Sequence, residues 1–346
     1  MSVTVTVKPS GRQFGVDSGE FLLEAALRQN VVLPYGCKNG ACGSCRAKIV
    51  EGTVEHGPHT EKALSAEDEK AGFALLCCAK ATADVVIEAK VVSAAGDIQV
   101  RKMPCRVSSI EKVAPDVVVM RLQLPANERL QYLAGQYVEL MLRDGSRRSY
   151  SMAGAPHAAD QVELHVRHMP GGKFTDALFG VTQPVVKERD ILRFEGPMGT
   201  FFLREESDKP IVFLASGTGL APIKAIVEHC IHKDIRRPVT LYWGGRRPQD
   251  LYMNALCEQW QRERPDFRYV PVVSDPMPED GWTGRGGFVH RAVMEDFPDL
   301  SGHQVYACGA PIVVESARAD FTAVCGLPAD EFFADAFTSA ADQAAG

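Results

Sequence analysis

The sequence lacks the features that would place the protein in a membrane or on nucleic acid. No apolar run is long enough to span a bilayer. The N-terminus, MSVTVTVKPSGRQF, alternates like a strand and lacks the basic-then-apolar layout of a signal peptide. The net charge of −6 argues against nucleic-acid binding. We therefore expect a cytoplasmic protein, and its 346 residues predict two or three domains.

The chain also has no internal repeats or low-complexity tracts. Its pattern of strand and helix signals changes twice along the sequence. Residues 1–93 form a β-rich unit with one helix, and the small-residue and charged stretch 94–103 is typical of a linker. Short strand signals separated by turn residues predict an antiparallel β-barrel over residues 104–206. Strands then alternate with helices over residues 207–346, which predicts a parallel sheet with helices on both faces.

Five of the ten cysteines gather in the first segment, where a reducing compartment favours metal or redox chemistry over disulfides. Cys37, Cys42 and Cys45 have the C-x4-C-x2-C spacing of plant-type [2Fe–2S] proteins, which need a distant fourth cysteine. Either Cys77 or Cys78 can be this fourth ligand. Small residues let the backbone approach a cluster, and the loop supplies Gly40, Ala41, Gly43 and Ser44. Zinc is the alternative, but zinc sites usually pair two C-x2-C elements and only one is present.

A second motif, Arg148-Ser149-Tyr150-Ser151, follows a strand and a DG turn. Its chemistry suits a flavin nucleotide: a forked guanidinium for phosphate, a ring to lie against the isoalloxazine, and a hydroxyl for flavin N5. Downstream, a glycine turn opens a helix whose first N–H groups can hold a pyrophosphate. Its residues are Gly171, Gly172, Lys173, Phe174 and Thr175.

The third motif, Gly217-Thr218-Gly219, lies between the apolar strand IVFLAS and a helix that begins near Ala221-Pro222. Glycines permit a tight turn and a close approach of the backbone to a dinucleotide pyrophosphate, although Pro222 replaces the last glycine of the full pattern. The next strand ends in Arg246-Arg247. An arginine at this place can receive the 2′-phosphate of NADP, so the choice between NADH and NADPH stays open.

Two residues near the end of the chain are further candidates. Cys308, with Gly309, follows the fourth expected strand of the last domain, at the sheet edge that faces the ligand crevice. Its thiol can pack against nicotinamide C4. Phe337 closes the ordered chain and is expected to cover the flavin until the nicotinamide displaces it. With Ser151, these two residues form the predicted catalytic set.

Taken in order, these motifs resemble the ferredoxin–NAD(P)H reductase superfamily, and more narrowly its class with a fused N-terminal plant-type ferredoxin. That class includes reductases of bacterial aromatic and methane oxygenases and CDP-6-deoxy-glucoseen reductase. The resemblance covers about residues 2–338 and implies a β-grasp ferredoxin domain, a β-barrel FAD domain and a parallel-sheet NAD(P)-binding domain. It also favours Cys77 as the fourth ligand. It further implies that Arg148, Tyr150 and Ser151 contact the flavin. The residues it implies at the nicotinamide nucleotide are Gly217, Thr218, Gly219, Cys308 and Gly309.

The resemblance implies an enzyme that moves electrons from NADH through FAD and a [2Fe–2S] cluster to a partner protein. An oxygenase component is the favoured partner, and a CDP-deoxysugar dehydratase is the alternative. Two other hypotheses are an electron-relay subunit that does not use NADH and a zinc-stabilised flavin reductase. We expect a monomer.

Overall fold

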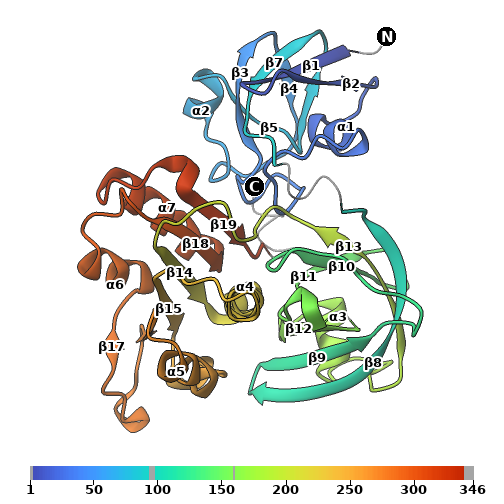
Figure 1. Ribbon diagram of the computed structural model, residues 1–346. Helices are drawn as coiled ribbons and strands as arrows, with labels where there is room; N and C mark the ends of the chain where they lie inside the picture. Colours follow the sequence, from blue (N-terminus) through green and yellow to red (C-terminus); the bar gives the residue numbers. More distant parts are fainter. Residues whose placement is uncertain (1–2, 93–97, 159, 339–346) are drawn as a thin grey trace. The chain divides into compact units, whose positions relative to one another are not determined.

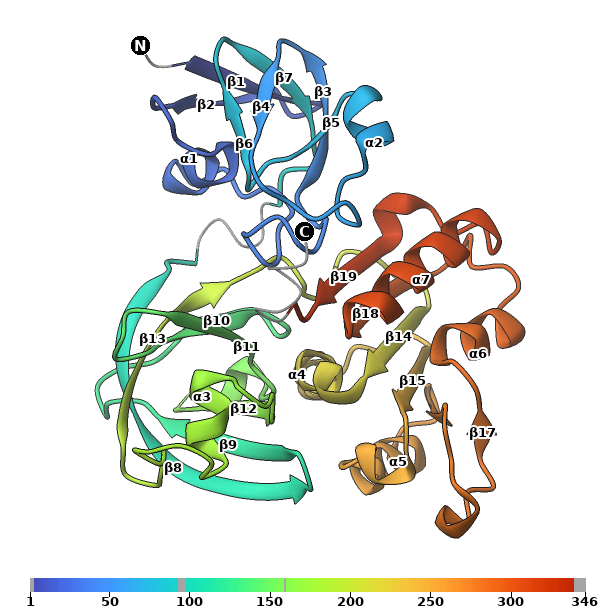
Figure 2. The same ribbon diagram turned by 180° about the vertical axis from the view of Figure 1, so that it is seen from behind.

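The computed structural model describes residues 3–92, 98–158 and 160–338 and has two compact units (Figures 1 and 2). The first unit comprises Met1–Gln99 together with Asp335–Gly346, and the second is Val100–Ala334. Part of the predicted linker, residues 94–97, lies outside the described residues.

The first unit is built on a mixed five-stranded sheet of order β2-β1-β7-β3-β5. β1 pairs antiparallel with β2 and parallel with β7, and β3 pairs antiparallel with β7 and β5. Helix α1 packs on this sheet through Leu22, Leu23 and Ala25. This is the predicted β-grasp arrangement. The elements are β1 (Val3–Lys8), β2 (Arg12–Val16), α1 (Leu22–Arg28), β3 (Arg46–Glu51), β4 (Val54–His56), α2 (Ala66–Lys70), β5 (Phe73–Leu75), β6 (Ala79–Ala81) and β7 (Val85–Glu88).

The second unit begins with a six-stranded sheet of order β11-β10-β13-β8-β9-β12, and every pairing in it is antiparallel. A bridge between Met152 and Leu164 joins its two edges and closes the predicted barrel. Phe174 and Leu178 of α3 add to the barrel core. The elements are β8 (Arg101–Ala114), β9 (Val117–Gln123), β10 (Tyr137–Met141), β11 (Arg147–Ser151), η2 (Pro156–Ala158), β12 (Gln161–Arg167), α3 (Lys173–Leu178) and β13 (Ile191–Met198).

The rest of the second unit forms the predicted parallel sheet, of order β17-β16-β15-β14-β18-β19. Helices α4 and α5 cover one face of it, and α6 and α7 cover the other (Figures 1 and 2). The elements are β14 (Ile211–Ser216), η3 (Gly217–Gly219), α4 (Leu220–His232), β15 (Val239–Gly245), η4 (Pro248–Asp250), α5 (Asn254–Glu263), β16 (Phe267–Val273), η5 (Pro278–Asp280), β17 (Arg285–Gly286), α6 (Val289–Asp296), β18 (Gln304–Gly309), α7 (Pro311–Ala323), η6 (Ala329–Glu331) and β19 (Phe332–Ala336).

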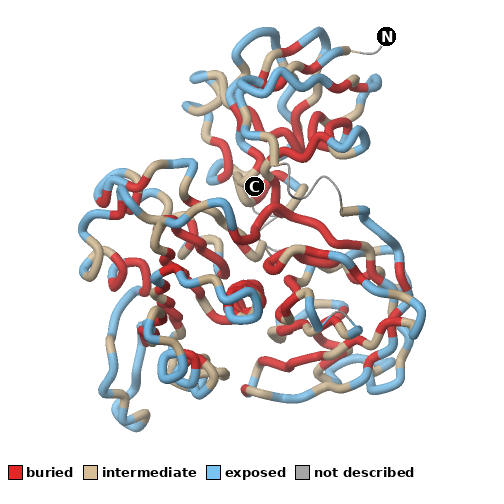
Figure 3. The backbone as a smooth tube through the Cα atoms, in the orientation of Figure 1, coloured by how far each residue is buried: buried red, intermediate tan, exposed pale blue. Residues whose placement is uncertain are grey.

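Burial follows this layering. In Figure 3 the buried stretches follow the inner strands, whereas loops are mostly exposed. β14 and β18 are almost wholly buried along their length, as expected for parallel strands covered on both faces. Within the three described ranges, no helix has the length and apolarity needed to cross a membrane.

Candidate functional site

The predicted cluster loop depends on a glycine that no other residue can easily replace. Gly40 has a φ of +78°, and a Cβ at this position would lie 2.8 Å from the Cys78 sulfur and 2.9 Å from the His59 Cβ. Lys38 and Gly43 also have left-handed φ angles, of 61° and 70°. The chain therefore coils tightly between Cys37 and Cys45, as the small residues of this stretch predict.

The cysteine sulfurs of this loop are arranged in two pairs. The Cys37 N–H donates to the Cys42 sulfur over 3.4 Å. The Cys37 thiol hydrogen-bonds to the same sulfur. This hydrogen bond outweighs the effect of burial and lowers the pKa of Cys42 to about 6. A bond to Cys45 raises the pKa of Cys77 above its ordinary value. An arrangement of two sulfur pairs fits a [2Fe–2S] cluster, because each of its two irons takes two thiolates.

The structure separates Cys77 from Cys78 by their surroundings. The Cys77 sulfur hydrogen-bonds to Cys45 and accepts a hydrogen bond from the Gly40 N–H. The Cys78 sulfur lies 3.5 Å from the Cys77 sulfur, and its bond to Cys77 raises the pKa of Cys78. Only Cys77 is therefore bonded directly to one of the three spaced cysteines, which supports its predicted place as the fourth ligand.

A single metal ion would need three or more ligands at one point. Among the residues that the structure describes, no three His, Cys, Asp or Glu side chains converge in that way.

The predicted flavin motif forms β11, which pairs with β10 along its whole length. Ser151 is buried opposite Tyr137, and Tyr150 packs on Phe174 with ring centroids 5.7 Å apart. The half-buried Arg148 donates to the Arg147 carbonyl over 2.7 Å. The strand therefore presents a forked cation, a ring and a hydroxyl in sequence, and their roles toward FAD stay predictions.

The glycine turn that precedes α3 is held by its own side chains. The Gly171 N–H donates to the Asp176 carboxylate over 3.1 Å, and the Gly172 N–H donates to the Met169 carbonyl over 2.8 Å. Thr175 donates to the same Met169 carbonyl over 2.8 Å. Lys173 pairs with Asp144 at 2.6 Å. The N–H groups of Gly171 and Gly172 are thus hydrogen-bonded within the turn. The contact of this whole glycine turn with a pyrophosphate stays a prediction.

The Gly217-Thr218-Gly219 turn forms η3 between β14 and α4, where three backbone segments pack closely. A Cβ on Gly219 would lie 2.2 Å from the Cys308 carbonyl oxygen. One on Gly309, whose φ is +128°, would lie 2.3 Å from the Ser216 hydroxyl oxygen. Both positions therefore require glycine. Pro222 stands in the first turn of α4, where its missing N–H has no helical partner to lose.

The two arginines after β15 differ in their surroundings. Arg247 forms a forked pair with Asp280, with N–O distances of 2.7 and 2.8 Å. Arg246 is exposed, and its backbone N–H donates to Asp250. Arg246 is therefore the better candidate for a 2′-phosphate, since the guanidinium of Arg247 is already engaged.

The last two candidates differ from expectation in detail. Cys308 and Gly309 are the final residues of β18 rather than residues that follow the strand, because the pairing of β18 with β14 reaches Cys308 itself. Cys308 has no exposed surface, and its predicted contact with a nicotinamide stays a prediction. Phe337 directly follows β19, is half-buried and groups with the first unit. Its predicted place over a flavin stays a prediction.

Several residues of this region were not singled out from the sequence. An Arg167 guanidinium nitrogen, Nη1, lies 2.7 Å from the place where a Gly217 Cβ would be, so the barrel contributes a cation to the predicted nucleotide turn. The strict alternation of QVELHVR is the signal that puts Glu163, His165 and Arg167 on one side of β12. The same alternation is typical of a solvated strand face, so it does not by itself indicate a site.

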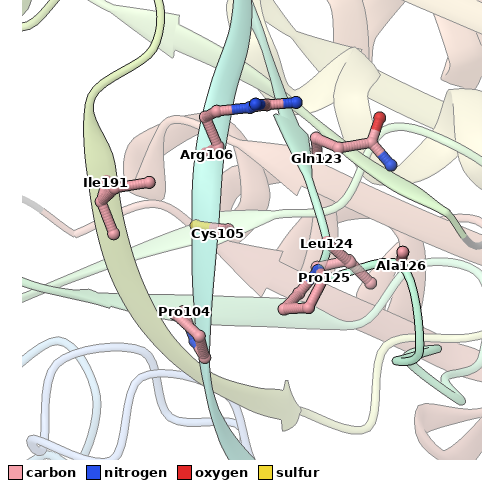
Figure 4. A pocket seen from close by; sticks show the side chains of 8 residues that line it. All are labelled: Pro104, Cys105, Arg106, Gln123, Leu124, Pro125, Ala126 and Ile191. Carbon is pink, nitrogen blue, oxygen red and sulfur yellow. The ribbon is translucent and has the colours of Figure 1, made fainter.

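The barrel also has a surface pocket, seen from close by in Figure 4. It has a volume of about 550 Å³, and none of the predicted site residues lines it. Its lining residues are Pro104, Cys105, Arg106, Gln123, Leu124, Pro125, Ala126 and Ile191.

Three family models match the chain in the order that the motifs predict. Residues 5–82 match the 2Fe-2S iron–sulfur cluster binding domain, residues 104–203 the oxidoreductase FAD-binding domain, and residues 213–319 the oxidoreductase NAD-binding domain. The expected cofactors, a [2Fe–2S] cluster, FAD and a nicotinamide nucleotide, are thereby confirmed.

Individual relatives match along almost the whole chain. The CDP-6-deoxy-L-threo-D-glycero-4-hexulose-3-dehydrase reductase of Yersinia pseudotuberculosis is 43% identical over 97% of this chain and 99% of its own. Reductase component 2 of terephthalate 1,2-dioxygenase from Comamonas sp. is 34% identical over 98% of both chains. The crystal structure of an Amycolatopsis cytochrome P450 reductase superposes with a TM-score of 0.76 at 34% identity, covering 97% of this chain and 99% of that one.

These matches bear out the predicted fold and the resemblance on which it was based. They also bear out an NAD(P)H-dependent oxidoreductase of the electron-transfer type. The chain belongs to the ferredoxin–NAD(P)H reductase superfamily, in the class that fuses a [2Fe–2S] ferredoxin domain to FAD-binding and NAD-binding domains.

Proposed function

We propose that this reductase delivers single electrons to a dehydrase that acts on a CDP-linked deoxyhexulose. One observation supports this choice over the oxygenase that the sequence alone favoured. Identity is 43% to a reductase named for such a dehydrase and 34% to reductase components of oxygenases, at similar coverage. A partner that accepts electrons is common to both groups of relatives.

We assign each motif a role toward one cofactor, beginning with the flavin motif. FAD held by the second unit would supply an acceptor for the two-electron hydride of NADH and a donor of single electrons, as a cluster and its partner require. Arg148 binds a flavin phosphate, Tyr150 lies against the ring and Ser151 donates toward N5. These tasks rest on the residue chemistry and on the pairing of β11 with β10.

For the nucleotide, the tasks divide between the two halves of the second unit. The Gly217-Thr218-Gly219 turn approaches the pyrophosphate, and Arg167 adds a positive charge from the barrel side. Cys308 and Gly309 shape the floor on which the nicotinamide lies. The closeness of these backbones at Gly219 and Gly309 supports this arrangement.

In the first unit, Cys37 with Cys42 and Cys45 with Cys77 are the proposed ligand pairs, one pair for each iron. The bonds within each pair support this assignment. We also propose the domain boundaries 1–93, 104–206 and 207–346 with a linker at 94–103, since each family match falls inside one of them. The end of this linker enters the barrel, because β8 begins at Arg101.

We further propose a cytoplasmic monomer. All ten cysteines are free thiols in the structure, which suits a reducing compartment. A single chain carries the three cofactor domains, so no second subunit is needed to complete the electron path. Light scattering of the purified holoprotein tests the oligomeric state, and a dimer mass would overturn that part.

The test is electron delivery with and without the cluster. The purified protein is expected to reduce cytochrome c with NADH. The variant Cys42→Ala is expected to lose that activity and keep flavin bleaching by NADH under anaerobic conditions. If cytochrome c reduction survives in a variant shown to contain no iron, the scheme is wrong. If wild-type flavin is not bleached by NADH, the electron-relay subunit becomes the better description.

The partner is tested separately. NADH consumption is measured with the protein and either a CDP-deoxyhexulose dehydrase with its sugar substrate or an aromatic oxygenase component with its own. Turnover with the dehydrase alone supports the proposal. Turnover with the oxygenase alone would support the second candidate, which the Comamonas relative favours.

A further inference from the structure

One strand of the barrel turns polar side chains toward the parallel-sheet half of the second unit. Val162, Leu164 and Val166 of β12 lie in the barrel core. The alternating residues Glu163 and His165 point outward, yet the His165 side chain has no exposed surface. The outward face of β12 is therefore covered by protein rather than by water.

Lys224 of α4 lies at the centre of this covered face and is itself 7% exposed. Its ammonium group lies 3.1 Å from the Glu163 carboxylate, 2.7 Å from the Glu228 carboxylate and 3.2 Å from the Ala153 carbonyl oxygen. An ammonium group has three N–H donors, so these three acceptors satisfy it completely. Such a cation can leave its place only by breaking charged contacts in a poorly hydrated region.

The contact with Ala153 connects Lys224 to the flavin motif. Ala153 follows Ser151 by two residues, and its own N–H donates to the Glu163 carbonyl over 2.8 Å. The segment just after the flavin motif is thus held from β12 by a backbone bond and from α4 by Lys224. Tyr132 adds a third bond, from its hydroxyl to the Gly154 carbonyl over 2.9 Å.

The same helix begins at the predicted nucleotide turn. α4 starts at Leu220, directly after Gly219, and Lys224 lies one turn further along. Two turns beyond, His232 stacks on His157 with ring centroids 3.9 Å apart and an interplanar angle of 12°. The helix that begins at the nucleotide turn therefore contacts the segment after the flavin motif at two points.

A second chain of bonds runs through the covered face. His165 lies 3.2 Å from Glu163 on one side and 2.9 Å from the Tyr252 hydroxyl on the other. Burial lowers the pKa of His165, although the bond to Glu163 opposes this, and the ring lies between the carboxylate and the hydroxyl. Although burial opposes it, the bond from His165 and the charge of Lys224 hold the pKa of Glu163 below its usual range.

A buried ion pair is weak evidence for stability, because well-packed apolar residues often serve as well. It does fix geometry, and hydride transfer is sensitive to geometry: a displacement of about 1 Å can cost roughly 100-fold in rate. We propose that Lys224 is a positioning residue that sets the distance between flavin and nicotinamide by tying Ala153 and Glu163 to α4. This inference rests on the proposed flavin and nucleotide sites.

The test compares Lys224→Met with a matched loss of a lysine–glutamate pair elsewhere in the second unit. Lys209 pairs with Glu331 at 2.7 Å, and neither residue takes part in the contacts of Lys224, so Lys209→Met is the control. Anaerobic stopped-flow measurements give the rate of flavin bleaching at saturating NADH and the NADH concentration at half saturation. With NADH deuterated at C4, the same measurement shows whether hydride transfer limits the rate.

For Lys224→Met we expect flavin bleaching to slow by about 10- to 100-fold, with FAD content and half-saturating NADH within about three-fold of wild type and a larger isotope effect. Lys224→Arg should recover part of the rate, since a guanidinium can still reach a carboxylate and a carbonyl. Lys209→Met should bleach at the wild-type rate.

If Lys224→Met fails to fold, Glu163→Gln is used in the same measurement instead. It removes the charge that pairs with Lys224 and retains the shape of the side chain. A wild-type bleaching rate in either folded variant would overturn the proposal. So would a loss confined to FAD or NADH binding. Failure of wild-type protein to bleach would instead contradict the proposed function, so the two failures are distinguishable.

Discussion

In the first unit, the predicted ligands come from one loop, residues 37–45, and one later position, Cys77. In the second unit, residues 148–151, 217–219, 224 and 308–309 must be brought together from different elements of the barrel and of the parallel sheet. The cluster loop is defined by local backbone shape, such as the left-handed φ of Gly40. The flavin–nucleotide region is defined by contacts between elements, such as those of Lys224 with Ala153 and Glu163. A local site tolerates changes elsewhere, whereas an assembled site depends on every element that borders it.

The largest expected effect tests how local the cluster site is. Cys77→Ser should lose most of its iron, because its thiol is the one bonded to Cys45. Cys78→Ser should retain wild-type iron and sulfide, although its sulfur is only 3.5 Å from that of Cys77. Iron and sulfide analysis of the two purified variants decides the matter. Loss of iron in Cys78→Ser with retention in Cys77→Ser would reverse the assignment.

The next effect tests the assembled site. In Gly219→Ala, the added Cβ would lie 2.2 Å from the Cys308 carbonyl oxygen, so the backbones must separate. We expect a loss of about 1–3 kcal/mol of unfolding free energy and slower flavin bleaching by NADH. Gly302→Ala is the control, because a Cβ there meets nothing within 4 Å. Equal stability of the two variants in urea titrations would contradict the close packing.

A smaller effect concerns the choice of nucleotide. Arg246→Ser should raise the half-saturating NADPH concentration by about ten-fold, the equivalent of one charged hydrogen bond, and leave that for NADH unchanged. Arg247→Ser should lower stability instead, since it breaks the forked pair with Asp280. Steady-state kinetics with both nucleotides separate these outcomes. An equal effect of Arg246→Ser on NADH and NADPH would rule out a 2′-phosphate contact.

The smallest effect is a pH dependence of the second unit. Burial and the neighbouring His232 lower the pKa of His157 below its ordinary value of 6.5. The unfolded chain therefore binds a proton at His157 more readily than the folded chain, and stability falls as pH drops below about 6.5. His157→Gln should make the free energy of unfolding less dependent on pH between 7 and 5. Urea titrations at both values measure it, and an unchanged slope would contradict the expectation.

The sequence predicts the local parts of this molecule well. The cysteine spacing, the Gly217-Thr218-Gly219 turn, the antiparallel barrel and the parallel sheet follow from local patterns, whereas the β-grasp fold of the first segment followed from the family resemblance. The alternation of β12 does not reveal which side of the strand is covered, so Lys224 and Arg167 went unrecognised. β17 has only two residues, and β19, FFADA, carries a charge in a short mixed pattern, so neither strand was predicted. Such strands form because they can pair with the edge of an existing sheet, and this depends on the tertiary structure rather than on the local sequence.

The strand order of the parallel sheet has a consequence for how the chain is made. β14 lies between β15, which follows it closely, and β18, which begins only at Gln304. During synthesis, one edge of this apolar strand stays open until most of the chain has left the ribosome. An open, apolar edge is a template for pairing with other chains. We therefore expect products truncated before Gln304 to aggregate, and the yield of soluble protein to improve when translation is slowed or chaperones are abundant.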